Sequence, residues 1–128
     1  MNPKKISLVV SLLKTTYGLL FLIAGLDKFF NTAVHWGKHM SGYFLSIIPL
    51  DMKTLIFIIG LFEIFLGILI FLPKWTKTGS LIASVLLIFI ALNLISLRSY
   101  YDLALCYIVM AIGALALSIL TSTIQHND

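Results

Sequence analysis

Hydrophobic residues make up 60% of this chain of 128 residues, whereas only 11% are charged. A soluble domain is typically about 45–50% apolar and about 25% charged, so this chain has too few charges to cover a water-soluble monomer. Composition therefore excludes a soluble enzyme, a disordered tail and a disulfide-stapled secreted domain as first interpretations, and predicts a small integral membrane protein. The net charge of +4 comes without a basic stripe interleaved with aromatic residues, so nucleic acid is not an expected partner.

Four apolar stretches are long enough to cross a bilayer as helices: residues 6–26, 54–72, 79–97 and 103–120. A membrane-spanning helix needs about 20 residues, and in lipid every backbone polar group must find its partner within the protein. The first stretch is read as a retained helix, because Asp27 and Lys28 follow it in place of a signal-peptide cleavage site. The sequence thus predicts an all-α, four-helix transmembrane bundle that forms a single integral membrane domain over residues 1–128.

The long connection between the first two stretches, residues 27–53, mixes aromatic residues with lysine and histidine. This mixture predicts a short helix lying in the membrane interface, with Trp36, Tyr43 and Phe44 at headgroup depth; an ordinary exposed loop is the alternative. His35 and His39 have the spacing that puts two imidazoles on one helix face. Because no third ligand is evident nearby, no metal site is expected.

An even number of spans places both chain ends on the same side of the membrane. The side of the termini receives Lys4, Lys5, Lys74 and Lys77, and the other side receives Lys28, Lys38, Lys53 and Arg98. The positive-inside rule is therefore a tie by number. We favour termini in the cytoplasm, because three acidic residues accompany the second group.

Small residues form a stripe along each apolar stretch, as expected of membrane helices that pack closely. The predicted packing faces carry Ser7, Ser11, Lys14, Gly18 and Gly25 on the first helix, Gly60, Glu63 and Gly67 on the second, Ser80, Ser84, Ala91 and Arg98 on the third, and Asp102, Cys106, Gly113 and Ala116 on the fourth. Cys106, the single cysteine, cannot form an intrachain disulfide and is predicted to be a packed core thiol.

Two ionisable residues lie deep within the spans and are the first candidates for a site. Glu63 is at the centre of its stretch and Lys14 is two residues from the centre of its own. A charge at that depth costs about 2.5–3.5 kcal/mol on insertion scales, so we predict that Lys14 and Glu63 neutralise each other. In the alternative, Lys14 extends to the interface and Glu63 is protonated. A purely structural role of Glu63 would fit the sequence equally well.

A second group of polar residues is predicted at one membrane face: Asp27, Lys28, Arg98 and Asp102, with Asn93 about a turn deeper. These side chains could border the mouth of a cavity or simply anchor the helices at the interface. We expect Arg98 and Asp102 to pair with each other or with Asp27 and Lys28, since partly buried charges prefer a partner.

Several short motifs, in their order and spacing, resemble the DoxX/MauE family of small four-helix membrane proteins. They are Ala24-Gly25-Leu26-Asp27-Lys28-Phe29, Gly60-Leu61-Phe62-Glu63-Ile64-Phe65-Leu66-Gly67, Gly79-Ser80-Leu81 and Asp102-Leu103, with Pro49 before the second span. Lys14 looks like the basic residue often found in the first helix of the family. The chain departs from the family pattern at Tyr101, where arginine is usual before the aspartate, and it lacks a cysteine pair.

The resemblance implies a bundle in the bacterial cytoplasmic membrane and a role in redox or assembly chemistry. The leading hypothesis is a redox-associated accessory subunit, rather than a stand-alone enzyme, that docks a partner oxidoreductase and contacts quinone, with Glu63 and the Asp27–Arg98–Asp102 side lining the site. The alternative is an assembly factor or chaperone whose acids bind another protein's transmembrane segment, and a small transporter ranks below both. Besides the lipid bilayer, a protein partner or a second copy of the chain is expected.

Overall fold

The computed structural model describes residues 2–30, 42–47 and 51–127, apart from the side chains of residues 43–45, 52 and 125–127. Within these ranges the chain is helical, without a strand, and the helices are α1 (Pro3–Phe30), α2 (Gly42–Ile47), α3 (Met52–Phe71), α4 (Thr76–Ser96) and α5 (Tyr101–Asn127). α1, α3, α4 and α5 are each long and apolar enough to cross a membrane. The predicted all-α bundle of four spanning helices is confirmed.

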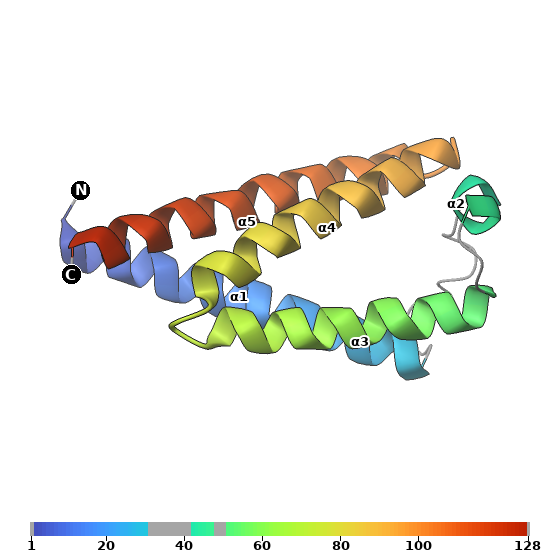
Figure 1. Cartoon of the computed structure of the whole chain (residues 1–128). Coiled ribbons are helices and arrows are strands. Elements are labelled where there is room, and N and C mark those ends of the chain that lie inside the picture. The colour runs from blue at the N-terminus through green and yellow to red at the C-terminus, as the bar shows by residue number, and fades with distance from the viewer. Residues whose placement is uncertain (1, 31–41, 48–50, 128) are drawn as a thin grey trace.

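The four long helices form two antiparallel pairs, α1 with α3 and α4 with α5 (Figure 1). Both chain termini and the turn between α3 and α4 lie towards one end of the bundle, which we call the terminus end. The short helix α2, the start of α3 and the turn between α4 and α5 lie at the other end, which we call the α2 end. The sequence-based expectation that both termini share one side is thus confirmed.

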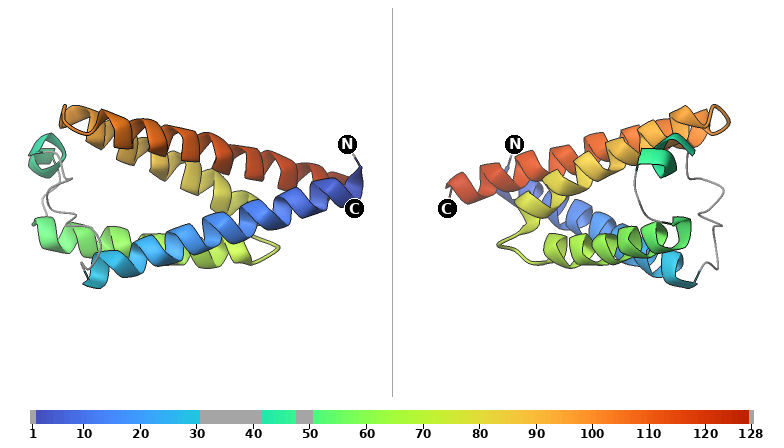
Figure 2. Two further views of the ribbon diagram at one scale, coloured as in Figure 1. Left: turned by 180° about the vertical axis from the view of Figure 1, so that it is seen from behind. Right: turned by 45° about the vertical axis from the view of Figure 1, so that its right-hand side comes forward.

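α1 crosses the bundle obliquely and so connects the two pairs. Seen from behind, it starts beside the end of α5 and finishes beside α3 (Figure 2). Its Tyr17 donates a hydrogen bond of 2.7 Å to the carbonyl oxygen of Met110 in α5, whereas its Gly25 packs against Gly60 in α3. As a result α1 ends short of the beginning of α3 (Figure 1), and its last turn lies beside the middle of that helix.

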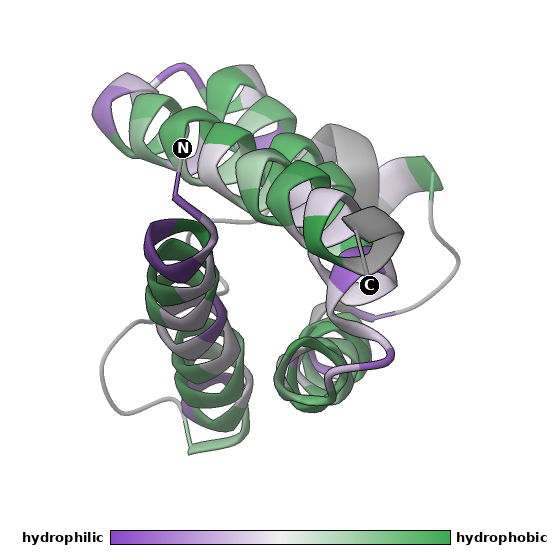
Figure 3. Cartoon of the chain, turned by 90° about the vertical axis from the view of Figure 1, so that its left-hand side faces the viewer, coloured by the Kyte–Doolittle hydropathy of each residue, from purple (hydrophilic) through white to green (hydrophobic). Residues whose placement is uncertain are grey.

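The core of the bundle is made of apolar side chains from all four long helices. Its buried members are Tyr17 and Phe21 from α1, Leu66 and Ile70 from α3, Ala83 and Leu87 from α4, and Ala111, Ala114 and Leu117 from α5. Much of the ribbon of these helices has the colour of hydrophobic residues (Figure 3), and large apolar side chains such as Leu105 and Phe65 are more than half exposed on the outside. A surface of this kind suits lipid, because acyl chains are as apolar as the side chains that meet them.

The predicted short helix in the long connection corresponds to α2, at Gly42–Ile47. His35, Trp36, Lys38 and His39 lie outside the described residues, as do the side chains of Tyr43 and Phe44. Their placement at headgroup depth therefore stays a prediction.

Candidate intramembrane site

A buried ion pair joins the two helices of the first pair near the middle of the bundle. Nζ of Lys28, in the last turn of α1, lies 2.7 Å from Oε2 of Glu63 in α3 and donates a hydrogen bond to it. The two side chains are 5% and 3% exposed. An isolated charge at this depth would cost several kcal/mol, so the pairing is what allows both residues to lie inside the membrane.

Glycines let the two backbones approach closely enough for this pair to form. A Cβ atom on Gly25 would lie 2.6 Å from the carbonyl oxygen of Gly60, and a Cβ atom on Gly60 would lie 3.0 Å from Cβ of Lys28. Lys28 follows Gly25 by three residues, and Glu63 follows Gly60 by three residues. Residues three apart share a helix face, so Lys28 and Glu63 both lie on the faces that meet where the two glycines cross.

Glu63 therefore has a different partner from the one that we predicted, and the Lys14–Glu63 pair is wrong. Lys14 is about one turn before Gly18, which packs against Phe71 at the far end of α3. At 1.5 Å per residue, Lys14 is roughly 20 Å along α1 from Lys28. The prediction centred the first span on residues 6–26, whereas the helix continues to Phe30 and places Lys28 beside the middle of α3.

Tyr107 of α5 adds a third polar side chain to this region. Its side chain is half-buried and lies within electrostatic range of the Glu63 carboxylate. We call these three residues, from α1, α3 and α5, the Lys28–Glu63–Tyr107 layer. Tyr107 carries no signal of this position in the sequence, because a tyrosine one turn inside an apolar stretch reveals its neighbours only once the helices are packed.

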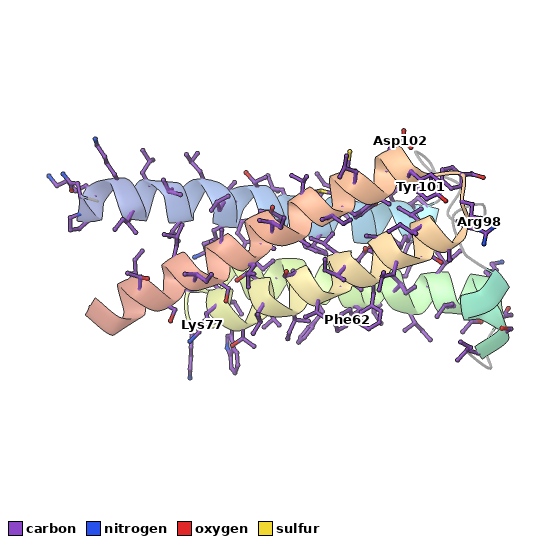
Figure 4. The ribbon with its side chains drawn as sticks, turned by 90° about the horizontal axis from the view of Figure 1, so that it is seen from above. Phe62, Lys77, Arg98, Tyr101 and Asp102 are labelled. Carbon is purple, nitrogen blue, oxygen red and sulfur yellow. The ribbon has the colours of Figure 1, made fainter. Side chains whose placement is uncertain are left out.

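The predicted cluster of Asp27, Lys28, Arg98 and Asp102 is divided by the structure. Lys28 turns into the bundle, Asp27 is half-buried, and Arg98 and Asp102 are exposed at the turn between α4 and α5. Figure 4 shows Arg98, Tyr101 and Asp102 at this end, with the side chains of Arg98 and Asp102 pointing in different directions. Within the described part of the chain no salt bridge joins Arg98 to Asp102, so the predicted pairing of these two residues with each other is wrong. The cavity mouth stays a prediction.

Asn93 lies in α4, towards the α2 end of the bundle, and its side chain is half-buried. It is six residues beyond Leu87 of the core. Asn93 is therefore about 9 Å nearer the α2 end than that core residue, at 1.5 Å per residue.

The packing face predicted for the fourth span is also wrong. Cys106 is exposed, as is Ala116, and the buried side of α5 instead carries Ala104, Ala111, Ala114 and Leu117. Cys106 is thus an exposed thiol on the outside of α5, and the prediction of a packed core thiol is wrong. The face predicted for the second span is buried as expected. The faces predicted for the first and third spans are buried in part: Gly18 and Gly25, and Ser80, Ser84 and Ala91, are buried, whereas Ser7, Ser11 and Arg98 are exposed.

The fold and this layer define a multi-pass membrane protein with an ion pair inside a four-helix bundle. A sequence model of the DoxX family matches residues 9–95, which run from the first turns of α1 almost to the end of α4. The chain belongs to the DoxX family. No curated protein and no solved structure matches it.

Proposed function

We propose that this DoxX-family protein is a redox-associated membrane subunit that docks a partner oxidoreductase and binds a quinone headgroup at the Lys28–Glu63–Tyr107 layer. The observation that carries the proposal is the buried ion pair of 2.7 Å between Lys28 and Glu63. An ionisable residue inside a membrane is by default a functional-site candidate. Here the two charged residues come from two different helices, and a tyrosine of a third helix lies within electrostatic range of Glu63.

The side chains of the layer fit the hydrogen-bonding needs of a quinone. The ammonium group of Lys28 and the hydroxyl of Tyr107 are donors for carbonyl oxygens, and the carboxylate of Glu63 is an acceptor for a quinol hydroxyl. The apolar outer faces of the helices suit an isoprenoid tail. A bound quinone would supply the electron and proton transfer, while Lys28 and Glu63 would orient the headgroup and hold a proton near it.

The rival function, an assembly factor whose acids bind another transmembrane segment, finds less support at Glu63. The carboxylate of Glu63 already forms a salt bridge with Lys28. Breaking a buried ion pair costs about 3–5 kcal/mol. A foreign segment that paired with Glu63 in place of Lys28 would have to offset this cost.

The experiment is a quinone-binding titration on protein purified in mild detergent, using a short-chain ubiquinone and a menaquinone analogue as probes. Tyr107→Phe should weaken binding by about fivefold, because a net hydrogen bond contributes about 1 kcal/mol. Tyr101→Phe is the matched control, since Tyr101 is exposed at the α2 end, and it should bind like the parent. Failure of both probes to bind, together with a stoichiometric membrane partner that co-purifies without quinone, would favour the assembly factor.

We also propose that the protein resides in the cell membrane with its termini in the cytoplasm. Lys28 is neutralised inside the bundle, which leaves Lys38, Lys53 and Arg98 as the exposed or loop-borne basic residues for the other side. The four lysines of the terminus side then outnumber these three. The positive-inside rule, which gave a tie with Lys28 included, therefore favours cytoplasmic termini.

A further inference from the structure

The packing of α1 on α3 places Lys14 at the depth of the turn between these helices and α4. Gly18 of α1 packs against the ring of Phe71, the last residue of α3. Lys14 precedes Gly18 by about one turn, or about 6 Å towards the terminus end, and residues four apart share a helix face. Lys74 follows Phe71 in the same direction, because α3 runs towards that end (Figure 1). The half-buried Lys14 is therefore beside the turn that carries Lys74.

The turn between α3 and α4 holds its two lysines in a defined place. The buried hydroxyl of Thr76 donates to the carbonyl oxygen of Ile70 at 2.8 Å, and the hydroxyl of Ser118 in α5 donates to the carbonyl oxygen of Lys77 at 3.0 Å. These hydrogen bonds tie the turn to the end of α3 and to α5. The side chains of Lys74 and Lys77 are exposed, so their ammonium groups are available to a ligand.

The charge of these lysines is not balanced within the described part of the chain. There, none of Lys14, Lys74 and Lys77 lies within salt-bridge distance of a carboxylate. Of the five acidic residues in the sequence, only Asp128 belongs to the terminus side. Positive charges that gather at one depth without a carboxylate attract an anion.

The surface next to these lysines is apolar. Leu72 at the end of α3, and Leu81 one turn beyond Lys77 in α4, are 44% and 46% exposed, and Trp75 is 45% exposed. Nζ of Lys74 lies 5.9 Å from the centre of the Trp75 ring, and tryptophan is enriched where acyl chains meet headgroups. Ammonium groups at the end of an exposed apolar surface suit an amphipathic anion, whereas free phosphate or a soluble acidic protein would leave the apolar part uncovered.

We propose that Lys14, Lys74, Lys77 and Trp75 form a binding site for an anionic phospholipid in the leaflet at the terminus end. The ammonium groups neutralise the lipid phosphate, and the acyl chains cover the apolar side chains beside them. Lys14 extends along its stem to the headgroups, as long basic side chains near the ends of a span do. The inference goes beyond the proposed quinone binding and does not depend on it, because the two sites share no residue.

Fluorescence quenching by brominated lipids tests the site, because Trp36→Phe leaves Trp75 as the single tryptophan of the chain. In that background the protein is reconstituted into vesicles of phosphatidylcholine with increasing fractions of phosphatidylglycerol, and one of the two lipids carries dibrominated acyl chains. Quenching of Trp75 then measures the relative affinity of the two lipids at this position. We expect phosphatidylglycerol to be preferred by about fivefold or more, since about fivefold is the contribution of one lysine near an anionic surface.

Lys14→Gln combined with Lys77→Gln should reduce the preference to about twofold or less, and it leaves Lys74 beside the reporting tryptophan. Lys4→Gln combined with Lys5→Gln is the matched control. It removes the same charge from the same end of the bundle, but Lys5 is about 14 Å along α1 from Lys14, so the preference should stay. Lys14→Arg combined with Lys77→Arg keeps both charges and should also retain it.

Equal losses in the two glutamine pairs would overturn the proposal, because they would show attraction to the whole terminus end rather than to a site. So would a preference that survives Lys14→Gln with Lys77→Gln. Loss of the preference on adding inorganic phosphate at constant ionic strength would identify a free anion as the ligand and would contradict a lipid site. A parent-like gel-filtration profile of each variant shows that the folded protein is compared. Loss of quinone binding with the lipid preference intact would count against the proposed function alone.

Discussion

Lys28 and Glu63 show how two charges are accommodated at a depth where either alone would be unfavourable. Each is almost fully buried, and Nζ and Oε2 are 2.7 Å apart. Desolvation of both groups offsets much of their attraction, so a buried pair adds little net stability even though breaking it is costly. The pair is therefore better understood as fixing the register of α1 on α3 than as a source of stability.

Arg98 is a second residue with an unusual environment, because its φ angle is +59°. It follows the end of α4, and its N–H donates to the carbonyl oxygen of Ile95 at 3.0 Å. Glycine is the usual residue at such a position, since a left-handed conformation costs other residues roughly 1–2 kcal/mol.

We expect Arg98→Gly to raise the free energy of unfolding by up to about 1 kcal/mol, because it relieves this conformational cost. Unfolding in mixed micelles with increasing dodecyl sulfate measures the change. Arg98→Ala removes the same guanidinium but keeps the strain, so it should give no gain; equal stabilisation by both substitutions would show that the side chain, and not φ, matters.

Tyr17 offers a test of the contact between α1 and α5. Its hydroxyl donates to the Met110 carbonyl oxygen at 2.7 Å, and the ring belongs to the core. Tyr17→Phe should lower the free energy of unfolding by about 1 kcal/mol, since it removes one hydrogen bond and retains the ring. Tyr101→Phe, at an exposed tyrosine, should leave stability unchanged, and a loss of the same size in both variants would contradict the assigned bond.

At the scale of elements, the contact between α1 and α3 depends on glycine rather than on large apolar side chains. Gly25 meets the carbonyl oxygen of Gly60, and Gly67 meets Leu22 and the carbonyl oxygen of Gly18. Lipid offers no hydrophobic reason for helices to associate, so close backbone approach provides the packing.

Gly25→Ala should therefore destabilise the protein by about 1–3 kcal/mol, the usual cost of overpacking, because its Cβ would lie 2.6 Å from both the Gly60 carbonyl oxygen and Cγ1 of Ile64. Gly42→Ala is the control, since a Cβ there meets nothing within 4 Å. The same unfolding assay applies, and a Gly25→Ala variant as stable as Gly42→Ala would show that the two backbones are not in contact.

Sequence patterns predicted the elements well and their relative rotation only in part. Apolar length located the four spanning helices, and small residues located the buried face of α3 and parts of those of α1 and α4, because both properties belong to single helices. The partner of Glu63 depends on where α1 crosses α3. Depth was judged from the centre of an apolar stretch, so Lys14 was chosen. The spacing of Lys28 from Gly25 and of Glu63 from Gly60 was a signal that these two residues share the faces where the glycines pack.

At the scale of the whole molecule, the bundle has two dissimilar ends. The terminus end carries Lys4, Lys5, Lys74 and Lys77, and Lys77 and Arg98 mark opposite ends of α4 (Figure 4). The α2 end carries the acidic residues Asp51 and Asp102 together with Lys53 and Arg98. The terminus end is the more basic, which favours the cytoplasmic side of a membrane.

A pair of reporter fusions tests this orientation. A green fluorescent protein fused after Asp128 should fluoresce, because it folds in the cytoplasm, whereas alkaline phosphatase fused at the same place should be inactive. Phosphatase inserted in the turn between α4 and α5 should be active. An active phosphatase at the C-terminus would contradict the proposed orientation.

The central claim, that Lys28 is the partner of Glu63, is tested most directly by a double-mutant cycle on the free energy of unfolding. Lys28→Met and Glu63→Gln should each destabilise the protein by about 3 kcal/mol, and the double variant should lose clearly less than their sum, with a coupling of at least about 1 kcal/mol. The parallel cycle with Lys14→Met should be additive. Additive losses for Lys28 and Glu63, or coupling between Lys14 and Glu63, would contradict the account.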